Sequence, residues 1–207
     1  MSRSFFALEK VFRFDLKYYF NAHTYAHPGS NFFTYSNYTH LTVDLYTVNI
    51  LYYTMQTFLP YKSFDESLKT LDWRCLGKQR VESMQILNVL LGRTNTKGWR
   101  NHPITRMWAG YENALKEYLN KCIDEWVRRG YNNNMLHEEI TGDIVYPNWL
   151  GNDTFHSSHR ANLLRKDKEF YSKFCWNEDS DNPYAWYDTD KQQWYLQHVG
   201  TGIREYI

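Results

Sequence analysis

A carboxylate among cations and an amide stands out in residues 71–91, LDWRCLGKQRVESMQILNVLL. Lys78, Gln79, Arg80 and Glu82 fall within about one turn of a helix. Lys78 and Glu82 are four residues apart, so their side chains meet on one helix face. A buried or half-buried carboxylate near cations can hold its charge and stabilise a cationic intermediate. The pattern predicts a site that binds an anion and does chemistry on it. The alternative is a solvent-exposed ion pair without a function.

The stretch Trp99-Arg100-Asn101-His102-Pro103 is a second candidate site. It precedes an expected helix, with Asn101 as the capping residue and Pro103 in the first turn. Free N–H groups at such a helix start favour an anion such as phosphate. Arg100 and His102 are therefore predicted to contact a phosphate, and simple helix entry is the alternative.

A third set of candidates follows one expected helix and the turn after it: His156, His159, Arg160, Arg165, Lys166 and Lys173. Arg, Lys, Ser and His along one helix suit phosphate contacts. Two histidines three residues apart could bind a metal, but no third ligand has suitable spacing, so no metal and no other cofactor are predicted. Aromatic residues around Lys173 suit either stacking on nucleobases or core packing.

Helical periodicity dominates from Met55 onward. Helices are expected at 63–71 with Ser63 as cap, at 74–91, at 104–129, and from Asp153 or Thr154 to 166, followed by a short turn at 167–174. Gly92 and Gly130 mark two helix ends. Gly77 inside the second helix costs up to about 1 kcal/mol relative to Ala, so a close backbone approach is expected there. The tail, 176–207, shows little regular pattern. Together these elements predict a compact all-α domain over 55–207.

Residues 1–54 differ in composition from the rest of the chain. They contain 8 Tyr and 7 Phe but only 4 basic and 3 acidic residues, and no hydrophobic period persists in them. Translated AT-rich, non-coding DNA has such a composition. We therefore expect an irregular extension, and our hypothesis is that translation starts at Met55. A partly folded N-terminal element is the alternative, and an intact mass that includes 1–54 would contradict the hypothesis.

Bulk properties narrow the class of protein further. The net charge is only +1, but residues 74–129 hold 11 basic and 5 acidic side chains, while the tail 176–207 holds 2 and 6. This distribution gives a basic centre and an acidic end. Three widely spaced cysteines argue against a zinc ribbon or a disulfide framework and favour a reducing, intracellular compartment. Neither a membrane span nor a secretory signal is expected.

Five blocks of the sequence resemble the pyrimidine dimer DNA glycosylase family, typified by phage endonuclease V. They are MQTFLPY (55–61), LDWRCLGKQRVESMQIL (71–87), GWRNHPITRMWAGYENAL (98–115), PNWLG (147–151) and FHSSHRANLLRKDKEFYSKFCW (155–176). The resemblance is closest to the bacterial and phage branch and does not extend to residues 1–54. It implies a single compact all-α domain, a monomer, and a substrate of double-stranded DNA with damaged pyrimidines.

In that family the α-amine of the N-terminal residue attacks the sugar C1′, a Schiff base forms, and β-elimination breaks the strand. A helix glutamate stabilises the cation, and the resemblance places it at Glu82. It also implies that Lys78, Gln79 and Arg80 contact the lesion or nearby phosphates. Arg160, Arg165, Lys166 and Lys173 would then hold the DNA backbone.

The nucleophile is where this sequence departs from the family pattern. Gln56 follows Met55 and is bulky enough to block removal of the methionine. The amine of Met55, Lys78 with a lowered pKa, or a water activated by Glu82 are the three alternatives. Two other functions also remain open: a transferase that modifies DNA on the same fold, and a non-catalytic nucleic-acid-binding module.

Overall fold

The computed structural model describes residues 55–94, 99–199, 201 and 203–207, so the expected extension 1–54 lies outside the described residues. Its helices are α3 (Phe64–Thr70), α4 (Trp73–Leu90), α5 (Pro103–Trp108), α6 (Glu112–Arg128), α7 (Asp153–Lys166) and α8 (Lys168–Tyr171). A 3₁₀ turn, η1 (Ser172–Phe174), follows α8, and the strands are β1 (Tyr184–Asp188), β2 (Gln193–Gln197) and β3 (Arg204–Tyr206). The fold is thus mostly helical, as expected.

Side-chain caps explain where the first two described helices begin. Ser63 Oγ accepts a hydrogen bond from Glu66 N in α3. The Asp72 carboxylate accepts from Arg74 N (2.8 Å) and Cys75 N (3.1 Å) and so caps α4. Each bond satisfies backbone N–H groups that have no partner inside the helix. The helices expected at 63–71 and 74–91 are confirmed within two residues at each end.

The single helix expected at 104–129 is wrong, because the chain breaks between α5 and α6. Ala109 is extended (ψ 127°) and Gly110 has φ +85°, a conformation that favours glycine. His102 caps α5 through Nδ1, so Asn101 is not the capping residue. Likewise α7 is capped by Asn152 and not by Asp153 or Thr154, the residues expected to cap it. Hydrophobic periodicity spans the break because α5 and α6 both face the core.

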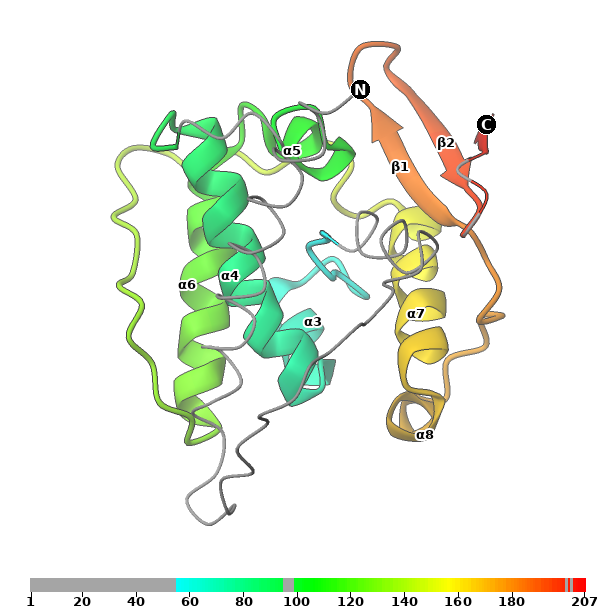
Figure 1. Ribbon diagram of the computed structural model, residues 1–207, viewed down its shortest axis with the longest axis horizontal. Coiled ribbons are helices and arrows are strands. Elements are labelled where there is room, and N and C mark those ends of the chain that lie inside the picture. Colours follow the sequence, from blue (N-terminus) through cyan, green and yellow to red (C-terminus); the bar gives the residue numbers. More distant parts are fainter. Residues whose placement is uncertain (1–54, 95–98, 200, 202) are drawn as a thin grey trace, which may run out of the picture.

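The acidic tail forms a three-stranded antiparallel sheet in the order β1-β2-β3, which corrects the all-α expectation. The sheet packs on α7 and α5 through β1 (Figure 1). Large aromatic side chains lie on both faces of β1, such as Trp186 and its neighbour Tyr187, so the sequence shows no alternation of apolar and polar residues. Asp188 Oδ1 accepts from Asp190 N and Lys191 N in the hairpin turn, a turn signal that was available in the sequence.

The segment 55–61 is the centre of the molecule. It is an irregular loop that lies between α4 and α6 on one side and α7 on the other (Figure 1). Met55, Phe58 and Leu59 are buried in the core. The segment has no neighbouring strand among the described residues, and side chains satisfy its backbone instead. These hydrogen bonds join the segment 55–61 to α4 and α6 on one side and to α7 on the other.

The contact between α4 and α6 explains the glycine inside α4. A Cβ built on Gly77 would lie 3.0 and 3.1 Å from two ring atoms of Trp126. The indole ring is held by a hydrogen bond from Nε1 to Asn132 O (2.8 Å), by stacking on Tyr131 (4.2 Å) and by Arg80 over its face (3.9 Å). The expectation of a close backbone approach at Gly77 is confirmed.

Gly77→Ala is expected to destabilise the protein although alanine is the better helix former. The gain in helix propensity is about 1 kcal/mol, but overpacking against a ring that cannot move typically costs about 1–3 kcal/mol. Urea unfolding of Gly77→Ala and of Gly77→Ala/Trp126→Phe measures the free energy of unfolding of each variant. The smaller ring should recover part of the loss. A single variant more stable than wild type would contradict the packing argument.

No helix among residues 55–94 and 99–199 is both long and apolar enough to cross a membrane.

Candidate active site

Glu82 lies at the point where α4 meets the segment 55–61. Its side chain is only 5% exposed. Lys78 Nζ lies 3.2 Å from Oε1, so the expected pairing of Lys78 and Glu82 is confirmed. On the other oxygen, Oε2, Gln79 Nε2 donates at 3.2 Å and the backbone nitrogen of Gln56 donates at 3.5 Å. The carboxylate is therefore a buried anion in contact with a cation, an amide and the backbone of residue 56.

Burial and charge act in opposite directions on Glu82. Burial raises the pKa of its carboxyl group, and this effect is the largest. The charge of Lys78, hydrogen bonds from Lys78 and Gln56 N, and the charge of Lys166 lower the pKa and partly offset burial. A carboxyl group with a raised pKa that still faces cations suits proton transfer and the stabilisation of positive charge.

Gln79 is completely buried, and its amide is fully engaged within the protein. Nε2 donates to Gln56 O (2.8 Å) and Glu82 Oε2, while Oε1 accepts from Phe58 N (2.8 Å) and Tyr118 Oη (2.8 Å). Two donors and two acceptor positions are all a carboxamide offers. Gln79 therefore has a structural role within the described fold, and the prediction that it contacts DNA stays untested.

His156 and His159 hold the segment 55–61 from the side of α7. Leu59 N donates to His159 Nδ1 (2.8 Å), and His156 Nδ1 donates to Leu59 O (2.7 Å). His156 Nε2 accepts from Gly151 N (3.0 Å). Burial lowers the pKa of both imidazoles, so both are neutral at neutral pH. The two side chains are 4% and 0% exposed and bind backbone groups, and the prediction that they contact DNA stays untested.

Two arginines that were predicted to contact DNA have partners inside the fold. Arg160 donates to Pro60 O (2.7 Å) and pairs with Glu178 (2.7 Å). Arg80 is 6% exposed, donates to Asn133 Oδ1 (2.8 Å), and has its pKa lowered by burial to about 10. These contacts give Arg80 and Arg160 a structural role, and the prediction that they bind phosphate stays untested.

The remaining predicted contacts lie nearer the surface. Arg100 and Lys173 are exposed, and Lys173 Nζ lies 3.5 Å from the ring centre of Phe170. Lys166 is partly exposed, with Nζ 5.5 Å from the ring centre of Phe58. Burial by neighbouring atoms, followed by the charge of Lys78, lowers the pKa of the Lys166 ammonium group.

His102 is half-buried between Trp99 and Trp186, and burial lowers its pKa to about 4. His102 is therefore a neutral helix cap and not a cation that could pair with phosphate.

Tyr118 is the site residue that sequence reasoning missed. It occupies a core position of α6, as the periodicity indicates, and is 0% exposed. Its hydroxyl nevertheless lies 2.8 Å from Gln79 Oε1 and 3.2 Å from Phe58 O. A tyrosine within an apolar stripe is the available signal, because a buried hydroxyl needs a hydrogen-bond partner.

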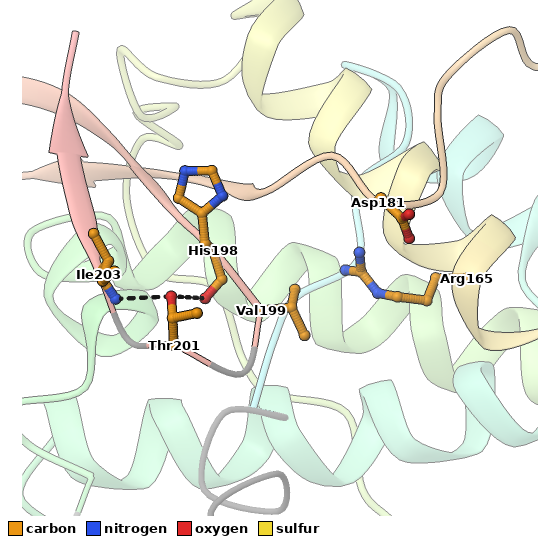
Figure 2. Close-up of a pocket in the computed structure, with 6 residues that line it drawn as sticks. All are labelled: Arg165, Asp181, His198, Val199, Thr201 and Ile203. Atoms are coloured by element: carbon orange, nitrogen blue, oxygen red, sulfur yellow. Dashed lines mark hydrogen bonds between the residues drawn. The ribbon is translucent and has the colours of Figure 1, made fainter.

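Arg165 belongs to a separate hollow of about 630 Å³ beside the C-terminal hairpin (Figure 2). The hollow is also lined by Asp181, His198, Val199, Thr201 and Ile203. Arg165 Nη1 donates to Ser180 O (2.6 Å), which ties α7 to the chain before β1. This contact gives Arg165 a structural role, and the prediction that it binds the DNA backbone stays untested.

No group of three or more His, Cys, Asp or Glu side chains among the described residues is arranged to hold a metal ion. Cys75, Cys122 and Cys175 are free thiols. Burial raises the pKa of Cys75 to about 12, which makes this thiol near Asp72 a poor nucleophile.

Comparison with known proteins bears on this site directly. The model of the family described as pyrimidine dimer DNA glycosylase matches residues 55–139. The resemblance expected from the sequence is confirmed for that segment, which contains α3 to α6, Glu82, Gln79 and Tyr118. The blocks at 147–151 and 155–176, and the C-terminal sheet, lie outside it. Searches of curated proteins and of solved structures gave no match.

Proposed function

We propose that this protein is a DNA repair glycosylase that acts on damaged pyrimidines, with Glu82 as the catalytic carboxylate. The observation that supports it best is the contact between a buried carboxylate and the backbone nitrogen of residue 56 (3.5 Å). Glycosidic bond cleavage develops positive charge at the sugar C1′, and a fixed anion stabilises that charge. The match to a glycosylase family over 55–139 agrees with this chemistry.

The nitrogen of residue 56 is favourably placed for an amine nucleophile. In the 207-residue chain it is a peptide amide and does not attack carbon. A chain that begins at Gln56 has its α-amine at this atom, and one that begins at Met55 has it one residue away. The amine nitrogen then bonds to C1′, the glycosidic bond breaks, and the base leaves with the bonding electron pair. Loss of a proton from nitrogen leaves a closed-ring aminal. The C1′–O4′ bond then breaks, O4′ takes up a proton, and the nitrogen lone pair forms the C=N bond of the Schiff base on which an AP-lyase step depends.

Lys78 is the weaker candidate for the amine. Its Nζ lies 3.2 Å from Glu82 Oε1, and an ion pair favours the protonated form, which is not a nucleophile. We propose instead that Lys78 holds the charge on Glu82 and attracts the DNA backbone. Exposed basic residues, among them Arg100, Lys166 and Lys173, would contact phosphates. Monomeric state and intracellular location remain predictions.

A duplex with a single pyrimidine dimer tests the proposed function. The full chain and a chain of residues 55–207 should each be assayed on this duplex and on an undamaged duplex of the same sequence. We expect alkali-labile sites at the dimer only, and only with 55–207, because the full chain has no free amine at residue 55 or 56. Transfer of a group to the DNA without base release would favour the transferase. Salt-sensitive binding with no product from either chain would favour a binding module.

A further inference from the structure

The carboxamide of Gln79 can adopt only one orientation between Glu82 and the segment 55–61. If its nitrogen and oxygen were exchanged, Oε1 would face two acceptors, Gln56 O and Glu82 Oε2. At the same time Nε2 would face the Phe58 N–H donor. Both contacts would be repulsive. The amide therefore links the carboxylate to the backbone of residues 56 and 58 in a fixed register.

Tyr118 supports this amide from the opposite wall. Its hydroxyl donates toward Gln79 Oε1 at 2.8 Å. The ring cannot move away, because Phe64 packs edge-on against it (5.3 Å) and Trp108 stacks beside it (6.3 Å). Burial raises the pKa of the hydroxyl well above its usual value, so it keeps its proton and stays a donor. Tyr118 therefore contacts Gln79, and Gln79 in turn contacts Glu82.

We propose that Gln79 and Tyr118 are positioning residues for catalysis: Tyr118 fixes the Gln79 amide, which aims Glu82 Oε2 at the nitrogen of residue 56. The proposal rests on the proposed function for its kinetic consequence. Both side chains are fully buried and touch no substrate. They act through Glu82, whose anionic form is stabilised by the donor on Oε2. Loss of either group should raise the pKa of Glu82.

Tyr118→Phe is the first test, because it removes one hydroxyl and keeps the ring. In 55–207, which has the free amine, kcat for the dimer duplex should fall about five- to tenfold, the loss expected for one hydrogen bond. KM should change less than about twofold, since no DNA contact is lost. The acid limb of the kcat–pH profile should move to higher pH. Gln79→Met keeps the side-chain volume and should reduce kcat by more.

The double variant shows whether Tyr118 acts through Gln79. In the Gln79→Met background, Tyr118→Phe should change kcat by less than about twofold, because the group that it orients is gone. Tyr146→Phe is the matched control, since it removes an exposed hydroxyl that bonds Glu117 Oε2 (2.7 Å). That variant should keep wild-type kcat and the wild-type pH profile. Independent, multiplying losses in the double variant would overturn the proposed order of contacts.

Direct titration of Glu82 separates this proposal from the proposed function. The side-chain carboxyl carbon of Glu82, assigned with Glu82→Gln, is followed by ¹³C NMR against pH. Its pKa should be higher in Tyr118→Phe and in Gln79→Met than in wild type. An unchanged pKa in both variants would overturn the proposal. If wild type leaves the dimer duplex intact, the proposed function fails, and the NMR titration still decides the positioning role.

Discussion

Glu82→Gln should abolish base release from dimer-containing DNA and leave DNA binding largely intact. The amide keeps the shape of the side chain but cannot stabilise a cation at C1′ or accept a proton. Loss of such a group typically costs about 10²–10⁴-fold in rate. Binding should change little, because Glu82 is 5% exposed and its removal takes a negative charge away from the phosphates. Single-turnover cleavage and a binding titration on one duplex measure both effects.

Glu117→Gln is the matched control for this experiment. Glu117 lies on α6 and interacts with Lys121 (3.9 Å) and the Tyr146 hydroxyl, so it is a carboxylate of the same charge outside the site. Its variant should cleave at the wild-type rate. Cleavage by Glu82→Gln at the wild-type rate would remove Glu82 from the mechanism. Weaker DNA binding with normal single-turnover cleavage would make it a binding residue instead.

Borohydride trapping on abasic-site DNA should give a covalent complex with 55–207 and with 56–207, but only background with 1–207. The nitrogen of residue 56 lies 3.5 Å from Glu82 Oε2, and it can form a Schiff base only as an amine. Reduction with borohydride makes that bond permanent. Mass spectrometry of the trapped peptide then identifies the nitrogen. We expect it at residue 55 in the first chain and at residue 56 in the second.

Lys78→Arg in 55–207 is the control, because it keeps the positive charge beside Glu82 and removes the primary amine. This variant should still be trapped. Loss of trapping would make Lys78 the nucleophile, and equal trapping of 1–207 would show that no free amine at residue 55 or 56 is needed. Base release without any trapped complex would favour a water activated by Glu82. Thermal unfolding of each chain confirms that it is folded.

Local sequence signals account for much of what could be predicted. Ser63 followed by Glu66 marked the start of α3, and the four-residue step from Lys78 to Glu82 predicted their contact. These features depend on residues within a turn or two of each other, so spacing is sufficient. The break at Gly110 and the sheet at 184–206 were not found. The hydrophobic period continues across the break because α5 and α6 face one core. The strand residues show no alternation of apolar and polar side chains because aromatic residues occupy both strand faces.

By itself, the sequence determined the glutamate on α4, its cationic neighbour and the resemblance to a glycosylase family. Only the tertiary structure decided what the surrounding polar residues do. Gln79, His156 and His159 have the residue types of a DNA-contacting surface, yet they are buried because the irregular segment 55–61 pairs with no strand among the described residues and needs their hydrogen bonds. A backbone group buried without a partner is costly. Hydrogen bonds between residues up to 100 positions apart in sequence avoid that cost. Residue spacing along one helix does not reveal such contacts.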